Sequence, residues 1–324
     1  MSQWTTNDLP DFQGKTVLIT GANSGLGFEA TKALASKGAH VIMASRSLEK
    51  GQQAQAEITT SVPGASLELR QLDLASLASI RAFAAEVQAA HTGLDLLLNN
   101  AGVMAIPRQE TPDGFEKQFG TNHLGHFALT GLLLPLLLAV PASRIVTTTS
   151  VARTTGKITF DDLQRQRSYG RWSAYGQSKR ANLLFAFELQ RRLHAAGTST
   201  LSVAAHPGGA NTNLQGTSIA LSGSGALAER VLYATLWRLV SQSALMGTLP
   251  QLYAATAPEI TGGELVGPGG AGNMRGYPKI DRKARNEDDQ PTAARLWEVS
   301  VELTGVNYAA LQVRKPVEVT EPTV

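Results

Sequence analysis

The chain has 324 residues, of which 43% are hydrophobic and 17% charged, and it contains no cysteine. The absence of cysteine excludes disulfide scaffolds, zinc–thiolate sites, iron–sulfur clusters and thiol nucleophiles. Lysine and arginine number 29 against 26 for aspartate and glutamate, a formal charge of +3, with no basic run that would indicate nucleic-acid binding. The length suits a large domain with a substantial core.

Neither the first residues nor the most apolar stretch indicates a membrane protein. Residues 1–14 are polar and lack the basic start and apolar run of a signal peptide. Residues 131–140 are strongly apolar, but Pro135 interrupts them and they are shorter than the roughly 20 residues that span a bilayer. We therefore expect a soluble, cytoplasmic protein with no membrane partner and a buried helix at 131–140.

Short apolar and β-branched runs alternate with longer segments of helical periodicity. The predicted strands are Thr16–Thr20, His40–Ser45, Leu67–Asp73, Leu94–Asn99, Arg144–Thr149, Leu201–His206 and Glu264–Gly267. The predicted helices are Leu26–Lys37, Leu48–Thr59, Leu77–Ala90, Phe115–Leu138, Ala174–Ala195 and Ser243–Ala257. This alternation is typical of the α/β class. It predicts one Rossmann-type domain over residues 15–270, a doubly wound parallel sheet of seven strands with helices on both faces.

Other segments do not follow this alternation. Residues 1–14 form an N-terminal arm, and residues 151–172 predict an extra lobe beside the strand ends. A largely apolar segment at about residues 215–240 predicts a helical substrate lid. The C-terminal extension, residues 271–324, begins with a basic loop whose charge is answered by acids at 287–289, which indicates a solvated loop. A helix at Thr292–Leu303 and mobile last residues are expected after it.

A glycine-rich turn, Thr20-Gly-Ala-Asn-Ser-Gly-Leu-Gly27, follows the first strand and opens the first helix. Glycine allows a tight turn and a close approach to a pyrophosphate, which the free N–H groups of the helix N-terminus attract. The cofactor-binding residues predicted here are Gly21, Asn23, Ser24, Gly25, Leu26 and Gly27. Gly14-Lys15-Thr16 is not a P-loop, because it precedes the strand and lacks the earlier glycine.

The end of the second strand predicts which dinucleotide binds. Ser45 and Arg46 lie where an acid would select the 2′-hydroxyl of NAD(H), whereas an arginine accepts the 2′-phosphate of NADP(H). We therefore favour NADP(H) over NAD(H), although Arg46 could instead be a solvated residue paired with a glutamate of the following helix. Asp73 and Leu74, after the third strand, would lie near the adenine, or Asp73 could cap the next helix.

Tyr175-Gly-Gln-Ser-Lys179 places a phenol and an ammonium four residues apart, on one face of a helix. A nearby ammonium favours the phenolate, so it would lower the pKa of Tyr175 from about 10 towards the working pH. Tyr175 is thus a candidate general acid–base. An ordinary pair on a surface helix would give the same spacing.

Several motifs occur together in an order that resembles one known family. They are the glycine turn, Asn99-Asn-Ala-Gly102, Asn122, Ser150, the Tyr175/Lys179 pair and His206-Pro-Gly208. Over residues 15–267 these resemble the short-chain dehydrogenase/reductase family. The segment 122–127, the long Ser150-to-Tyr175 spacing and the turn at 44–46 look most like the branch of retinol dehydrogenases and protochlorophyllide reductases. A chain without cysteine argues against the light-dependent reductases.

The resemblance implies hydride transfer between the nicotinamide and a carbonyl carbon. Ser150 would stabilise charge on the substrate oxygen, and Tyr175 would donate or accept the proton. Lys179 would assist Tyr175 and hold the nicotinamide ribose, and Asn122 would anchor a water that relays protons to Lys179. Further residues would lie along the cofactor: Asn99, Ala101, Gly102, Pro207, Gly208 and Thr212.

Other polar residues have simpler interpretations. We interpret His123, His126 and His206 as packing or hydrogen-bonding residues. No group of histidine and acidic residues has metal-ligand spacing, so no metal is expected. Ser150 is not an esterase nucleophile, because it lacks the Gly-x-Ser-x-Gly elbow.

The apolar lid predicts a small-molecule partner, a medium-sized hydrophobic carbonyl compound or alcohol. An NADP-dependent carbonyl reductase or alcohol dehydrogenase is the favoured function. The alternative is a non-catalytic NAD(P)-sensing protein on the same fold. The helices at Phe115–Leu138 and Ala174–Ala195 could form a homo-oligomer, and the C-terminal tail could block or extend that contact, so the oligomeric state stays open.

Overall fold

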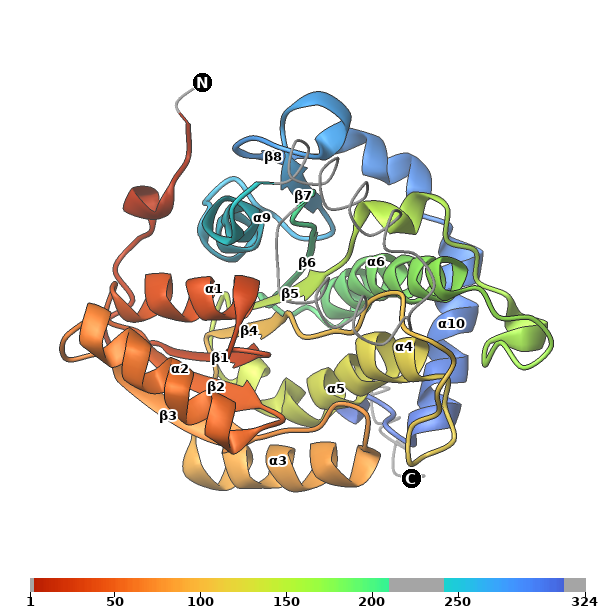
Figure 1. Cartoon of the computed structure of the whole chain (residues 1–324), viewed down its shortest axis with the longest axis horizontal. Helices are drawn as coiled ribbons and strands as arrows, with labels where there is room; N and C mark the ends of the chain where they lie inside the picture. The colour runs from red at the N-terminus through yellow and green to blue at the C-terminus, as the bar shows by residue number, and fades with distance from the viewer. Residues whose placement is uncertain (1–2, 210–241, 312–324) are drawn as a thin grey trace, which may run out of the picture.

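A mixed sheet of eight strands organises the computed structural model, which describes residues 3–209 and 242–311 (Figure 1). Its order is β3-β2-β1-β4-β5-β6-β7-β8. The strands are β1 (Thr16–Thr20), β2 (His40–Ser45), β3 (Ser66–Gln71), β4 (Leu96–Asn99), β5 (Arg144–Thr148), β6 (Leu201–Ala205), β7 (Leu265–Pro268) and β8 (Pro278–Ile280). The first seven are parallel and β8 is antiparallel to β7. The winding reverses between β1 and β4, which opens a crevice at the carboxyl ends of these strands.

Helices cover both faces of the sheet (Figure 1). The longer ones are α1 (Gly25–Ala35), α2 (Leu48–Ser61), α3 (Leu77–Ala90), α5 (Gly125–Leu138), α6 (Arg171–Ala195), α9 (Ala244–Thr256) and α10 (Gln290–Thr304). Helices α1, α2 and α9 pack on one face and α3, α5 and α6 on the other, while α10 lies against α6. No helix of the described residues is long and apolar enough to cross a membrane.

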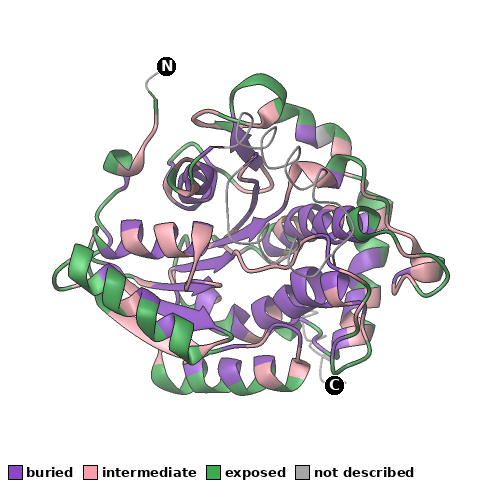
Figure 2. Cartoon of the chain, in the orientation of Figure 1, coloured by how far each residue is buried: buried purple, intermediate pink, exposed green. Residues whose placement is uncertain are grey.

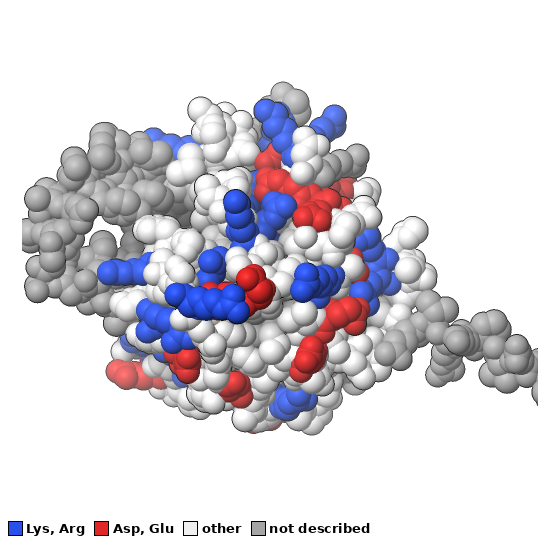
Figure 3. Space-filling view, turned by 90° about the vertical axis from the view of Figure 1, so that its right-hand side faces the viewer, with Lys and Arg blue, Asp and Glu red and all other residues white. Residues whose placement is uncertain are grey.

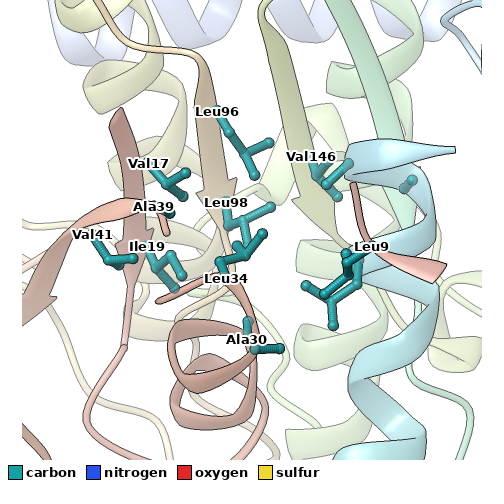
Figure 4. Close-up of a cluster of buried hydrophobic side chains, with 14 of the residues drawn as sticks. Leu9, Val17, Ile19, Ala30, Leu34, Ala39, Val41, Leu96, Leu98 and Val146 are labelled. Atoms are coloured by element: carbon teal, nitrogen blue, oxygen red, sulfur yellow. The ribbon is translucent and has the colours of Figure 1, made fainter. Parts of the chain in front are cut away.

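The central strands are apolar on both sides because helices cover both faces. Successive side chains of a strand point to opposite faces, so Val17 and Ile19 join the cluster under α1 and α9 (Figure 4). Leu18, between them, joins the cluster on the α3 and α5 side. Figure 2 shows the buried strands enclosed by helices whose outer surfaces are exposed. The N-terminal arm belongs to this core, since Leu9 is buried in the first cluster (Figure 4).

The predicted α/β fold is confirmed, with two corrections. The sheet has an eighth strand, β8, within the C-terminal extension. It was missed because three residues that begin with Pro278 give no alternating pattern. The helix predicted at Phe115–Leu138 is instead a short α4 (Lys117–Phe119), a π-helical turn (Gly120–Leu124) and α5.

The segment 281–289, predicted as a solvated loop of mixed charge, contains a 3₁₀ helix at Arg282–Glu287 and is partly exposed, but Glu287 and Asp288 are bound in ion pairs. Its carboxylates pair with arginines of other elements: Glu287 with Arg153 and Arg180, and Asp288 with Arg191. Figure 3 shows acidic and basic side chains interspersed on the face of the molecule that it presents. The division of the chain at residue 270 stays a prediction, but residues on both sides of it contribute to one sheet.

The lobe before α6 is held against that helix by two glycines. A Cβ on Gly156 would lie 2.1 Å from the carbonyl oxygen of Gly176, so only glycine permits this approach. The lobe contains two short 3₁₀ turns, Val151–Thr154 and Phe160–Asp162. The lid predicted at about residues 215–240 and the cofactor contact predicted for Thr212 lie outside the described residues.

Candidate active site

The glycine turn lies at the crevice, between β1 and α1. Gly21 and Gly25 have φ values of +67° and +56°, a region that side chains with a Cβ rarely adopt. A Cβ on Gly27 would lie 2.3 Å from the carbonyl oxygen of Gly21. The turn is fastened from β4, since the side-chain amide of Asn100 donates to the Thr20 carbonyl at 2.8 Å. The backbone is therefore held in the tight form that a pyrophosphate needs.

The N-terminus of α1 faces the crevice with open N–H groups. Ser24 is its N-cap residue, but the Ser24 side chain makes no capping hydrogen bond. In contrast, Ser47 and Ser76 cap α2 and α3 with their side chains. Free N–H groups and the helix dipole attract an anion. A diphosphate fits this position.

Cations line the far end of the crevice, after β2. Arg46 is exposed and Lys50 follows one turn into α2, and both line the cavity. Among the described residues, neither Glu49 nor Glu57 forms an ion pair with Arg46. The pairing of Arg46 with a glutamate of the following helix, offered as the alternative, is therefore absent from the described residues, and the exposed Arg46 faces solvent and the cavity.

Asp73 does not cap the following helix. Ser76 does so, by accepting from the Ser79 N–H, whereas Asp73 accepts from the Ala75 N–H at 2.9 Å. Asp73 and Leu74 both line the cavity beside Ser45, whose hydroxyl donates to the Ser47 carbonyl. The Asp73 carboxylate is thus free of the helix and available to the crevice.

Ser150, Tyr175 and Lys179 meet at the other end. Ser150 follows β5, and the other two lie one turn apart on α6. The Ser150 hydroxyl is near enough to the Tyr175 phenol to lower the pKa of that phenol through its side chain. The Lys179 ammonium donates to the Thr148 carbonyl at 3.1 Å and lies 5.8 Å from the centre of the Tyr175 ring. Three groups that can bind an oxygen and move a proton therefore share one corner.

Burial controls the protonation of these groups. It raises the pKa of Tyr175 to about 12, against the opposite effect of the Ser150 side chain. Burial also lowers the pKa of Lys179 to about 8. The pKa of Tyr175 is thus raised, not lowered towards the working pH as expected, because loss of water disfavours the phenolate. Tyr175 is a protonated phenol at neutral pH.

Asn122 lies behind this corner, in the π-helical turn. Its side chain accepts from the Val103 N–H at 2.8 Å and donates to the Val103 carbonyl and to the Ser178 hydroxyl. The backbone carbonyl of Asn122 lies 3.0 Å from Nδ1 of His126. Nδ1 must carry the proton of this bond, because a carbonyl only accepts. Asn122 thereby fixes the loop segment that follows Gly102.

A single cavity of about 1020 Å³ joins the two ends. It brings together most of the predicted residues: Gly21, Asn23, Ser24, Gly25, Leu26, Ser45, Arg46, Asp73, Leu74, Ala101, Gly102, Ser150, Tyr175, Lys179, Pro207 and Gly208. Gly27, Asn99 and Asn122 are not on its wall. The side-chain amide of Asn99 is buried and donates to the hydroxyls of Thr130 and Thr147, so it connects β4 with β5 and α5.

Sequence reasoning missed several residues of the site. The sequence identifies Asn100 only as part of a motif, yet its side chain hydrogen-bonds the Thr20 carbonyl and so holds the glycine turn in place. Lys50 could have been found as a second cation one turn after Arg46. Arg153 gave no signal, because its ion-pair partner Glu287 lies 134 residues further along the chain. His206 is buried, as expected, and burial lowers its pKa to about 3.

A doubly wound parallel sheet with a glycine turn at its switch point is the architecture of dinucleotide-binding α/β proteins. The family model of the short chain dehydrogenases matches residues 15–220. The chain belongs to this family and, within it, to the retinol dehydrogenase branch. It is thus an oxidoreductase of a family that uses a nicotinamide cofactor.

Known proteins are similar in sequence to this chain over most of its length. Mouse retinol dehydrogenase 12 is 41% identical over 298 residues, which cover 91% of this chain and 88% of the relative. Human retinol dehydrogenase 13 is 42% identical over 300 residues, covering 92% and 87%. Among solved structures, an uncharacterised protein from Mycobacterium paratuberculosis is 42% identical with a TM-score of 0.76, covering 95% and 99%. A short chain dehydrogenase from Shigella flexneri 2a, solved with NADP, is 22% identical with a TM-score of 0.61 and shares the fold, covering 78% and 96%.

Proposed function

We propose that the protein is an NADP(H)-dependent oxidoreductase that interconverts a medium-sized hydrophobic carbonyl compound and its primary or secondary alcohol. The observation that carries this proposal is the convergence of Ser150, Tyr175 and Lys179 at one end of a cavity whose other end holds the glycine turn. The nicotinamide supplies or accepts the hydride.

The chain's own residues handle the proton and the oxygen. The Ser150 hydroxyl donates to the substrate oxygen and stabilises its developing charge. The Tyr175 phenol, protonated at neutral pH, donates its proton to that oxygen in the reductive direction. Lys179 lies beside Tyr175 and stabilises the phenolate that remains. Gly102 lines the cavity, and a Cβ there would lie 3.0 Å from Oδ1 of Asn122, which packs behind it.

Replacement of Tyr175 by phenylalanine tests the enzyme against the non-catalytic alternative. Tyr175→Phe removes the transferable proton and keeps the ring, so an enzyme loses at least about 100-fold in turnover while it still binds NADPH. Tyr169→Phe is the matched control, because the Tyr169 hydroxyl contacts the Ile106 carbonyl on a neighbouring loop. A wild-type chain that binds cofactor but turns over no carbonyl compound or alcohol would favour the sensor.

The preference for NADPH rests on Arg46 and Lys50, which give the adenosine end two cations and no acid at the end of β2. A guanidinium suits the 2′-phosphate because it binds two oxygens at once. In fluorescence titrations, Arg46→Ala weakens NADPH binding about tenfold or more and leaves NADH binding unchanged. Arg167→Ala, an exposed arginine away from the cavity, is the control. Equal wild-type affinity for the two cofactors would overturn the preference.

The proposal of an apolar substrate is based on the cavity wall beside Tyr175 and on the relatives named as retinol dehydrogenases. Met104, Val151 and Trp172 line that wall, and the Trp172 ring packs edge-on against Tyr175 at 6.1 Å. A planar indole in this position favours an extended apolar molecule of the retinal type. Trp172→Ala raises the KM for retinal several-fold and changes the Kd for NADPH little. Turnover of small charged carbonyl compounds alone would contradict this substrate class.

A further inference from the structure

Two histidines and a glutamate meet at the edge of the sheet formed by β3. Nε2 of His40, at the start of β2, lies 3.1 Å from Oε2 of Glu68 in β3. Nε2 of His91, at the C-terminal end of α3, lies 3.0 Å from the same oxygen. The three atoms lie within 4.8 Å of one another, and the imidazole rings are 5.6 Å apart. Three potential metal ligands therefore point at one spot.

This cluster is separate from the active site. His40 begins β2, and His91, the C-cap residue of α3, reaches the same end of the sheet. These are the amino ends of the parallel strands, whereas the dinucleotide crevice lies at their carboxyl ends. None of the three residues lines the cavity of the active site. The expectation that no metal-ligand group exists came from spacing along the sequence, and these residues are brought together by strand pairing instead.

Neighbouring groups orient the three side chains. The Ser66 hydroxyl lies 2.8 Å from Nδ1 of His40, which leaves Nε2 of this ring facing Glu68. Arg70 hydrogen-bonds the other carboxylate oxygen, Oε1, and so leaves Oε2 to the histidines. Outer partners of this kind set the ring orientation and tautomer of metal-binding histidines. The hydroxyl of serine can donate or accept, so it supports the tautomer in which Nε2 is free to bind a cation.

Charge and access also suit a cation. Arg70 is shared between Glu68 and Glu86, so with both histidines neutral these three side chains, His40 and His91 together carry a formal charge of −1. The His40, Glu68 and His91 side chains are 34%, 24% and 15% exposed, so an ion can enter from solvent while the site stays partly shielded. Two imidazole nitrogens and one carboxylate oxygen form a donor set typical of zinc.

We propose that His40, Glu68 and His91 bind one divalent cation of the zinc class, with solvent completing the coordination. Ligands about 2.1 Å from a tetrahedral zinc ion are about 3.4 Å apart, so the nitrogen–oxygen distances need only a small expansion. The bound ion connects β2 and β3 with the end of α3. Because the folded chain alone presents this geometry, the ion stabilises the fold and leaves the oxidoreductase site unchanged.

Zinc titration of the tag-free full-length chain, freed of metal by a chelator, tests this proposal. The wild type binds one zinc equivalent, and Co²⁺ at the same site gives the visible bands of low-symmetry coordination. His91→Gln and Glu68→Gln weaken zinc binding about ten- to hundredfold or more. Ser66→Ala weakens it less. His194→Gln removes an exposed histidine outside the cluster and binds zinc as the wild type does.

Thermal unfolding gives a second, independent measurement. Zinc raises the Tm of the wild type and of His194→Gln, and this increase is lost in His91→Gln. Circular dichroism of each variant without metal verifies that it is folded. Zinc affinity that is the same in all variants, or no saturable binding to the wild type, overturns the proposal. Either result would leave a hydrogen-bonded cluster in which both histidines donate to Glu68.

Discussion

The guanidinium of Arg153 connects the carbonyl of Ser150 to the carboxylate of Glu287. Nη1 donates to the Ser150 carbonyl at 3.2 Å, and Nη2 donates to Glu287 at 3.2 Å. The Arg153 side chain is only 3% exposed, and Arg180 pairs with the second oxygen of Glu287. The C-terminal extension thus supports the backbone that carries the Ser150 hydroxyl, through a residue on neither of the long helices.

Replacement of Arg153 by lysine keeps the charge but loses the planar fork that reaches both partners. We expect Arg153→Lys to lower kcat about tenfold or more with little change in the Kd for NADPH, because Ser150 is displaced and the glycine turn is not. Steady-state kinetics and fluorescence titration measure the two effects. Arg167→Lys, in an exposed ion pair with Asp161, is the control. An unchanged kcat would show that Ser150 needs no such support.

Trp297 connects α10 to the core. It packs against Phe127 and Tyr308, with ring centres 5.1 and 4.5 Å away, and it is 3% exposed. We expect Trp297→Ala to lower the free energy of unfolding by about 3–5 kcal/mol, the cost of a large cavity. Chemical denaturation measures this loss. Trp172→Ala, at an exposed position, should lower the free energy of unfolding far less. Equal losses would mean that α10 is not part of the core.

Three buried histidines make stability depend on pH. Burial lowers the pKa of His123 to about 3, of His126 to about 4 and of His206 to about 3. In the unfolded chain their pKa is about 6.5, so between pH 6.5 and 4 the unfolded state binds more protons than the folded state. The free energy of unfolding therefore falls as the pH falls through this window.

The slope of this dependence is measurable between pH 7.5 and 5.5. Each buried histidine adds up to about 1 kcal/mol per pH unit once its unfolded form is protonated. His206→Gln should reduce the slope, whatever it does to stability at pH 7.5, while His194→Gln, at an exposed position, should not. A slope unaffected by His206→Gln would show that His206 is protonated in the folded chain.

Gly27 is the glycine whose replacement should damage the cofactor site most. A Cβ there would meet backbone, the Gly21 carbonyl oxygen, at 2.3 Å, and neither side of this contact can rotate away. We expect Gly27→Ala to weaken NADPH binding at least tenfold in a fluorescence titration. Gly51→Ala is the matched control on α2, because its Cβ would meet only the Leu69 side chain, which can move. Similar binding by both variants would remove the geometric role assigned to Gly27.

An element could be predicted where its burial leaves a clear pattern of apolar residues in its own sequence. The strands around Leu18, Ile42 and Leu97 are buried on both sides and read as continuous apolar runs. β8 could not be predicted, because its pairing with β7 depends on contacts across the sheet rather than on its own three residues. The break in the helix at Gly120–Leu124 was missed for a similar reason, since apolar periodicity continues through a π-helical turn.

The candidate site could be predicted where its residues lie in short motifs. The glycine turn and the Tyr175/Lys179 pair each lie within eight residues, and the structure brings them into one cavity. The direction of the Tyr175 pKa shift could not be predicted, because it is set by burial of the phenol, which only the folded structure shows. Arg153 could not be predicted either, since ion pairs such as Arg153–Glu287 join segments more than 100 residues apart.

The hydroxyl of Thr20 links both ends of the cavity floor. It accepts from the N–H groups of Asn100 and Ala101, at 2.9 and 3.0 Å, and lies 2.9 Å from Nε2 of His126. The opposite nitrogen of His126 bonds the carbonyl of Asn122. A continuous chain of hydrogen bonds therefore joins the strand before the glycine turn to the π-helical turn that carries Asn122. Val151 and Trp172 lie on the cavity wall outside this hydrogen-bonded chain.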